Sequence, residues 1–204
     1  MSTTAPDWFG VARARAHDAH AREGPLIPPE APLVMSRAWA MPNRRTFSIK
    51  PIADLLARVV GPSERWLDPF ANEARIATIT NDLNPSMGTD FNEDARDFLG
   101  LFKDDQADGI LYDPPYTLRQ VKECYDGIGI AMTQHDTQHL FSEIRDGIAR
   151  ATRLGGLVVS FGYSTVGIGK SRGFRLEEVL LVCHGGIHHD TIVTVERKVK
   201  EVEI

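Results

Sequence analysis

Short apolar runs alternate with amphipathic segments from about residue 50 to the C-terminus. The stretch 51–60, PIADLLARVV, starts with a proline suited to the first turn of a helix, and Gly61-Pro62 would end it. Helical spacing recurs at 93–102 and 136–152. This alternation predicts an α/β fold with a mostly parallel sheet. The expected strands are the apolar runs 65–68, 76–80, 109–112, 157–162, 176–183 and 191–197.

The last two expected strands have no helix between them. Only the segment 184–190 separates them, which is too short for a parallel crossover. We therefore expect an antiparallel hairpin at the C-terminal end of the sheet.

The first 42 residues have a different pattern. Residues 6–22 show a weak helical period, and 24–42 contain five prolines, so we expect a helix followed by an extended connector. The whole chain, 1–204, is expected to be a single domain, with 1–42 as its N-terminal extension and 43–204 as its core.

Composition favours a globular protein, with 42% apolar and 25% charged residues and no apolar run long enough to cross a membrane. The polar N-terminus lacks the apolar stretch of a signal peptide, and Cys124 and Cys183 are far apart in sequence. We therefore expect a cytoplasmic protein with reduced thiols and no membrane contact.

The net charge of −5 argues against a nonspecific binder of polyanions. Acids are absent from 31–53 and from 147–176, however, so cations are concentrated there. We expect these two windows to form one basic face. Its cations would include Arg44, Arg45, Lys170 and Arg172.

Asp113-Pro114-Pro115-Tyr116 follows the apolar run 109–112 directly. Ligands of open α/β sheets bind at the carboxyl ends of strands, where this motif is expected. The Asp113 carboxylate and the Pro114 carbonyl can both accept from a planar amino group, and the Tyr116 ring can stack on a base. An ordinary turn after a strand would also explain the motif.

The motif resembles the catalytic motif of S-adenosylmethionine-dependent amino-methyltransferases that act on DNA bases. The stretch 48–56, SIKPIADLL, is similar to the Lys-Pro-x-x-Leu-Leu segment of many of these enzymes, and 66–71, WLDPFA, to their Leu-Asp-Pro-Phe cofactor motif. The resemblance spans about 45–197. It implies a Rossmann-like methyltransferase sheet, S-adenosylmethionine as cofactor, and methyl transfer to DNA adenine N6. An RNA base is the alternative substrate.

The resemblance also implies roles for single residues. Catalysis would involve Asp113, Pro114, Pro115 and Tyr116. In the cofactor site, Asp68 would meet the methionine amino group, Asp82 or Asn84 the ribose, and Asp97 with Phe98 the adenine. The remaining cofactor-side residues would be Phe47, Lys50 and Phe70.

Nucleic acid is the implied partner, with DNA preferred over RNA. The loop 117–135 would close over an extruded base, because such enzymes must take their target out of the stack. No separate recognition domain is evident, so a homodimer or a specificity partner could supply one. The implied nucleic-acid contacts are Arg44, Arg45, Arg119, Lys170 and Arg172.

The chain also departs from the family pattern. Ala71-Asn72-Glu73-Ala74 stands where a Gly-x-Gly motif is usual, and only about eight residues precede the next apolar run. The first crossover helix is therefore expected to be truncated or missing. These departures leave a second class of function open, a non-catalytic nucleic-acid or partner-binding module on a methyltransferase scaffold.

The histidine-rich segment 183–190 has cysteine and histidine ligands that zinc can use, but it lacks a paired Cys-x-x-Cys and lies in an expected hairpin turn. We expect exposed turn histidines and no metal site. The serines Ser160 and Ser164 lack the Gly-x-Ser-x-Gly context of a hydrolase.

Overall fold

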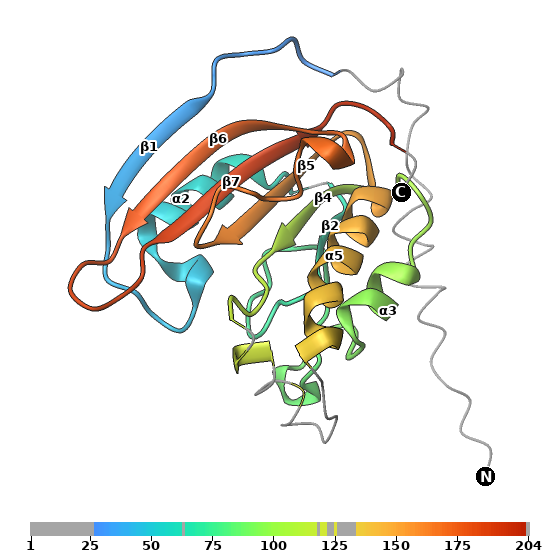
Figure 1. The fold of residues 1–204 in the computed structure, drawn as a ribbon, viewed down its shortest axis with the longest axis horizontal. Coiled ribbons are helices and arrows are strands. Elements are labelled where there is room, and N and C mark those ends of the chain that lie inside the picture. The colour runs from blue at the N-terminus through green and yellow to red at the C-terminus, as the bar shows by residue number, and fades with distance from the viewer. Residues whose placement is uncertain (1–26, 63, 118, 122–124, 126–133, 203–204) are drawn as a thin grey trace.

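Seven strands form one sheet in the order β1-β6-β7-β5-β4-β2-β3 (Figure 1). The computed structural model describes residues 27–62, 64–117, 119–121, 125 and 134–202. The strands are β1 (Val34–Trp39), β2 (Trp66–Asp68), β3 (Ile79–Thr80), β4 (Ala107–Tyr112), β5 (Thr152–Gly162), β6 (Phe174–Cys183) and β7 (Thr191–Lys198). The helices are α2 (Lys50–Val59), α3 (Ala95–Gly100) and α5 (Gln134–Ala151), with 3-10 turns η1 (Thr46–Ser48), η2 (Pro85–Met87) and η3 (Lys170–Arg172).

Strand β7 runs antiparallel to both of its neighbours, β5 and β6. All other pairs are parallel. The expected α/β fold with a mostly parallel sheet and a C-terminal antiparallel hairpin is confirmed. Because β4, β5 and β6 all point the same way, their carboxyl ends lie at one edge of the sheet (Figure 1).

Strand β1 corrects the expectation of an extended connector over 24–42. It pairs in parallel with β6, from Val34 opposite Glu178 to Trp39 opposite Cys183. Its flanking prolines, Pro32 and Pro42, lie outside the strand and do not interrupt its hydrogen bonding. The expected helix over 6–22 lies outside the described residues.

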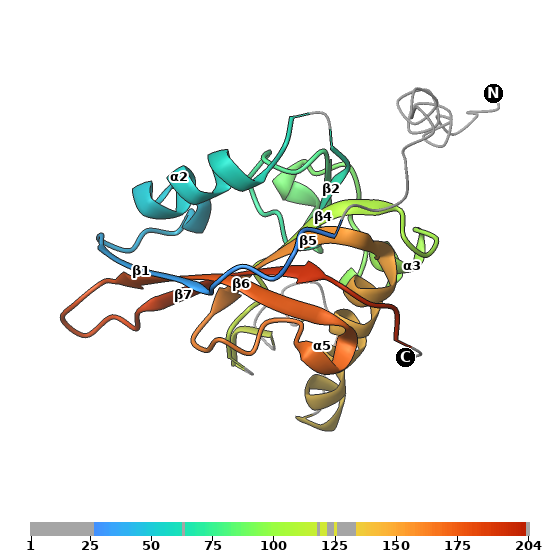
Figure 2. The same cartoon turned by 90° about the horizontal axis from the view of Figure 1, so that it is seen from above.

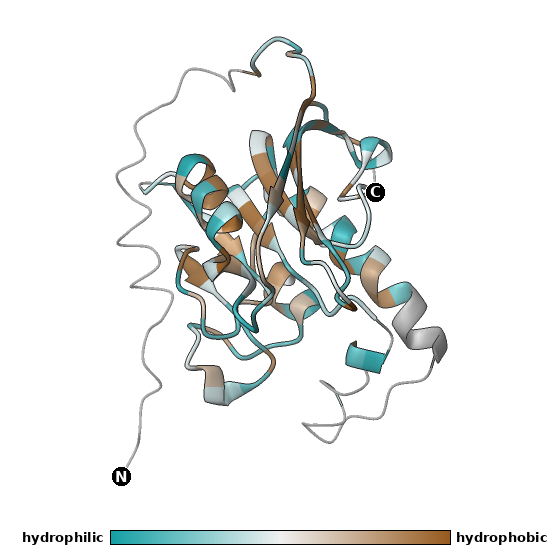
Figure 3. Cartoon of the chain, turned by 90° about the vertical axis from the view of Figure 1, so that its left-hand side faces the viewer, coloured by the Kyte–Doolittle hydropathy of each residue, from teal (hydrophilic) through white to brown (hydrophobic). Residues whose placement is uncertain are grey.

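Helices cover both faces of the sheet (Figure 2). Helix α2 packs on one face through Ile52, Leu55 and Leu56, which are almost fully buried. Burying each such side chain contributes about 1.5–3 kcal/mol. A proline in the first turn begins this helix, as the sequence predicts. The brown apolar residues of Figure 3 accordingly lie on the strands and on the inner sides of the helices.

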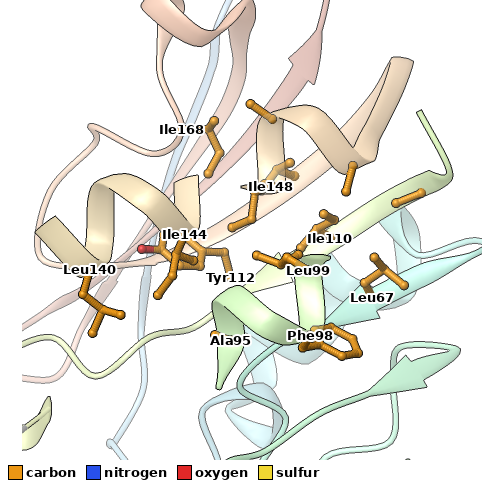
Figure 4. Packing of buried hydrophobic residues seen from close by; sticks show 14 of the residues in the cluster. Leu67, Ala95, Phe98, Leu99, Ile110, Tyr112, Leu140, Ile144, Ile148 and Ile168 are labelled. Atoms are coloured by element: carbon orange, nitrogen blue, oxygen red, sulfur yellow. The ribbon is translucent and has the colours of Figure 1, made fainter. Parts of the chain in front are cut away.

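Helices α3 and α5 pack together on the other face (Figure 4). Ile144 and Ile148 of α5 lie beside Leu99 of α3 and Ile110 of β4, and all four are almost fully buried. No helix of the described residues is long and apolar enough to span a membrane.

The connection from β2 to β3 contains no helix, as the short spacing predicts. A turn replaces it, and Arg75 holds that turn in place. The Arg75 guanidinium donates to the carbonyl oxygen of Asn72 at 3.1 Å and to that of Met87 at 2.5 Å. These bonds connect the turn to η2 without a packed helix.

Candidate functional site

Two carboxylates lie at the carboxyl edge of neighbouring strands. Asp68 is the last residue of β2, and Asp113 directly follows β4, with which β2 pairs. Burial is the main cause of the raised pKa of Asp68, and the charges of Asp113 and Asp82 raise it further. The fold therefore brings together three acids that the sequence assigned to one site.

Asp68 is a buried carboxyl group with one unused oxygen. Its Oδ1 accepts the backbone N–H of Phe70 at 3.0 Å, whereas Oδ2 is buried without a partner among the described residues. Burial raises the pKa of Asp68 well above its ordinary value, and the other acids add to this effect. Such an oxygen suits a cationic donor that enters the site, because an unpaired buried acceptor is unfavourable.

Asp113 forms a hydrogen-bonded pair with Tyr116, whose hydroxyl donates to Oδ1 of the carboxylate. Burial raises the pKa of Asp113 to about 6, and side-chain hydrogen bonds from Tyr116 and Thr46 partly counter the rise. Burial also raises the pKa of the Tyr116 phenol, so that it keeps its proton. Thr46 was not among the predicted site residues, and only its place beside Phe47 pointed to it.

Two predicted cofactor-side aromatics flank this edge. Phe47 is buried against Phe161, with ring centroids 4.9 Å apart, and Phe70 is half-buried near Tyr112 at 6.1 Å. Lys50 is exposed, and its Nζ contacts both carboxylate oxygens of Asp54, the closer at 2.8 Å.

Asp82 holds the turn that stands in place of the missing Gly-x-Gly motif. Its Oδ2 accepts the N–H of Asn72 and its Oδ1 that of Asn84, both at 2.9 Å. Asn72 has a φ of 48°, a conformation that normally favours glycine. Asn84 in turn accepts the N–H of Ser86 at 3.0 Å and caps η2. The predicted ribose ligands Asp82 and Asn84 thus already accept hydrogen bonds from nearby backbone N–H groups.

The predicted adenine pair divides between core and surface. Phe98 is fully buried, with Phe91 and Phe102 packed against its ring at 5.6 and 5.2 Å. Asp97 is exposed in the first turn of α3. Phe98 is therefore a core residue in this structure, whereas Asp97 is accessible.

No family model matches this chain, and no curated protein matches it either. Solved structures do resemble it. TrmN from Thermus thermophilus is 22% identical over 74% of this chain and 49% of its own, with a TM-score of 0.52. An rRNA methylase from Streptococcus thermophilus is 11% identical over 79% and 100%, with a TM-score of 0.49. NSun6 from Pyrococcus horikoshii is 18% identical over 72% and 51%, with a TM-score of 0.48.

The likeness to TrmN is one of fold. The chain has a Rossmann-like methyltransferase fold. The chain spans about half the length of the TrmN and NSun6 chains. Within this fold, Asp113-Pro114-Pro115-Tyr116, the DPPY segment, follows the carboxyl end of β4, the strand next to β2, where open α/β sheets bind their ligands.

The predicted single basic face is wrong. Lys170 and Arg172 form η3 just before β6 begins, at the opposite end of the sheet from the DPPY segment (Figure 1). Arg172 donates to Asp146 at 2.5 Å and lines a cavity of about 550 Å³ there. Because β6 is parallel to β5, the connecting segment must return along the sheet before β6 starts.

The other predicted nucleic-acid contacts are only partly described. Arg44 is exposed, and Arg45 donates to Glu73 at 2.5 Å. Arg119 is exposed at the start of the expected loop over 117–135, most of which lies outside the described residues.

The histidine-rich turn joins β6 to β7. His184 is buried, with Nδ1 2.7 Å from the Ala40 carbonyl oxygen and Nε2 2.8 Å from the Thr191 hydroxyl. Within the described ranges, no three histidine, cysteine or acidic side chains are grouped so as to hold a metal ion. His184 instead ties the segment after β1 to β7.

Proposed function

We propose that this protein transfers a methyl group from S-adenosylmethionine to an exocyclic amino group of a nucleic-acid base, with DNA adenine N6 as the first substrate to test. The observation that carries the proposal is the unpartnered Oδ2 of Asp68 beside Asp113. The Asp68 carboxylate suits a cationic cofactor, and the Asp113 carboxylate suits an amine that is to be alkylated.

The acidic residues at the carboxyl ends of the strands have the charge that a cationic cofactor requires. S-adenosylmethionine carries an ammonium group and supplies an electrophilic methyl group from its sulfonium when bound. Asp68 would accept the ammonium through Oδ2, and the cation would lower its pKa, against the burial and the neighbouring acids that raise it. Since Asp68 is fully buried, the turn beyond it must open for this contact. Asp97 and the turn held by Asp82 and Asn84 would flank the adenosine.

The DPPY segment would orient the substrate. The Asp113 carboxylate and the Pro114 carbonyl accept the two hydrogens of the amino group, which turns the nitrogen lone pair toward the methyl group. The Tyr116 hydroxyl occupies Oδ1 of Asp113, so the amine replaces it there, and the freed ring can stack on the base. As the nitrogen becomes cationic, the Asp113 carboxylate stabilises it and can take its proton.

The test is incubation with labelled S-adenosylmethionine and unmethylated DNA or RNA, followed by mass spectrometry of the nucleosides. We expect N6-methyladenine from DNA and none from an Asp113→Ala variant. Product from RNA alone would reassign the substrate. A thermal-shift assay runs in parallel, because a ligand that binds only the native state raises its melting temperature. If neither stabilisation by the cofactor nor product is seen, the chain is a non-catalytic module on this fold.

A further inference from the structure

Three rings from three separate loops form a continuous aromatic row that starts at the DPPY motif. Tyr116 contacts Tyr163, with ring centroids 4.9 Å apart, and Tyr163 contacts His189 at 5.1 Å. Tyr163 directly follows β5, and His189 lies in the turn between β6 and β7. All three therefore lie at the carboxyl edge of the sheet. We call Tyr116, Tyr163 and His189 the aromatic row.

The two outer rings of the row do not belong to the core. Tyr163 keeps 45% of its surface exposed, and His189 is exposed. Among the described residues, no hydrogen bond fixes the Tyr163 hydroxyl. Packing alone does not require two solvent-exposed rings next to the half-buried Asp113 and Tyr116. Exposed aromatic rings are, however, what proteins use to stack on unpaired bases.

We infer that the substrate is an unpaired polynucleotide strand, whose bases flanking the target stack on Tyr163 and His189. This inference rests on the proposed function and narrows its substrate. Bases in a duplex are stacked on each other and present only their edges in the grooves, whereas bases of a single strand can be splayed onto side chains. The Tyr116 and Tyr163 rings are inclined by 62° and the Tyr163 and His189 rings by 46°, so bases that stack on their faces cannot lie parallel as they do in a stacked strand. A strand that follows the row must therefore be partly unstacked.

The charge of the protein agrees with recognition by stacking. The net charge is −5, and two of the four cations expected on one face, Lys170 and Arg172, lie at the opposite end of the sheet. These two cations are therefore too far from the row to contact the phosphates of a strand that lies on it. Base–ring stacking is largely independent of salt, whereas each phosphate contact on a single strand steepens the salt dependence by about 0.7 in slope.

The experiment measures fluorescence anisotropy of labelled 12-nucleotide single strands, one DNA and one RNA of equal sequence, and of the matching duplexes, without cofactor. We expect single strands to bind at least tenfold more tightly than duplexes, with a shallow salt slope of about two or less. The DNA and RNA arms identify which sugar is preferred.

The Tyr163→Ala and His189→Ala variants should each weaken single-strand binding about five- to a hundredfold, as expected from the loss of one stacked base, and leave the salt slope unchanged. Tyr163→Phe keeps the ring and should stay within twofold of the parent. Leu101→Ala is the control, because Leu101 is 47% exposed and follows α3 away from the row. Melting temperatures verify that all four variants are folded.

Equal affinity for duplex and single strand, or unchanged binding by Tyr163→Ala, would overturn the inference. Because binding is measured without cofactor, its outcome is separate from that of the methylation assay. Ring-dependent strand binding without methylation would refute only the proposed chemistry. Methylation of a duplex that is insensitive to Tyr163→Ala would refute only the strand inference.

Discussion

Replacing Asp113 with asparagine should make the protein more stable at neutral pH while lowering its activity. Burial raises the pKa of Asp113 from 3.8 to about 6, so the folded state holds this proton more tightly than the unfolded chain does. The resulting stabilisation is complete below pH 3.8 and is lost as the pH rises through 6. At pH 8 the ionised, half-buried carboxylate therefore lowers stability relative to a neutral side chain.

The magnitude follows from the pKa difference. A rise of about 2.2 units (6 − 3.8), at 1.36 kcal/mol per unit, costs about 3 kcal/mol at pH 8. At pH 5 the same linkage costs only about 1.6 kcal/mol, because the folded carboxyl group is then mostly protonated. The gain in unfolding free energy from Asp113→Asn should thus be about 1.4 kcal/mol larger at pH 8 than at pH 5. The substitution also removes the negative charge that raises the pKa of the neighbouring Asp68, and this too should increase stability at the higher pH.

Urea unfolding followed by circular dichroism at the two pH values measures this difference. Subtracting the gain at pH 5 from the gain at pH 8 cancels every effect of the amide that does not depend on pH, including an altered hydrogen bond to Tyr116. Glu93→Gln, on the surface, controls for the loss of one negative charge. Turnover of Asp113→Asn should fall about ten- to a hundredfold, because a neutral acceptor stabilises the cationic nitrogen less, and Asp113→Ala should lose turnover entirely. An equal gain at both pH values, or full turnover in Asp113→Ala, would refute the assignment.

Three further outcomes are expected. Tyr116→Phe removes a hydrogen bond that lowers the pKa of Asp113, so the acid limb of the pH–activity profile should move to higher pH. Asp82→Ala removes two exposed hydrogen bonds to backbone N–H groups, each with a net contribution of about 0.5–1.5 kcal/mol, so urea unfolding should show a loss of about 1–3 kcal/mol even without ligand. Gly109→Ala would place a Cβ 2.6 Å from the buried Trp66 ring, which should cost about 1–3 kcal/mol by the same measurement. In the control Gly100→Ala, at an open position of α3, no such loss is expected, and the alanine should stabilise the helix by up to about 1 kcal/mol.

Most of the sheet could be predicted from the apolar pattern, but its first strand could not. The strands from β2 onward are buried runs between helical patterns, and the position of β7 follows from the short connection before it. β1 lies at an edge and is largely exposed, so no alternation of apolar and polar residues marks it among the prolines. Only its partner β6, far along the chain, makes it a strand.

The candidate site shows the same division. Asp68, Asp82 and Asp113 could be placed together at the carboxyl ends of the strands, because each ends or shortly follows a strand expected in a parallel sheet. The hydrogen bonds of Thr46 and Tyr116 to Asp113 depend on side-chain geometry that no spacing contains. The error over Lys170 and Arg172 came from treating a whole connection as if it stayed at the edge where it starts.

The edge position of β1 bears on how the chain assembles during synthesis. Val34 pairs with Glu178, which is 144 positions later (178 − 34). At about 5–20 residues per second, a ribosome needs about 7–30 s to make the partner of a strand that has already emerged. Strand β1 must therefore wait through that interval and longer, because β6 is joined to the rest of the sheet only by β7, which is translated after it. Slow codons or a bound chaperone in that window would act on this single strand, which completes one edge of the sheet.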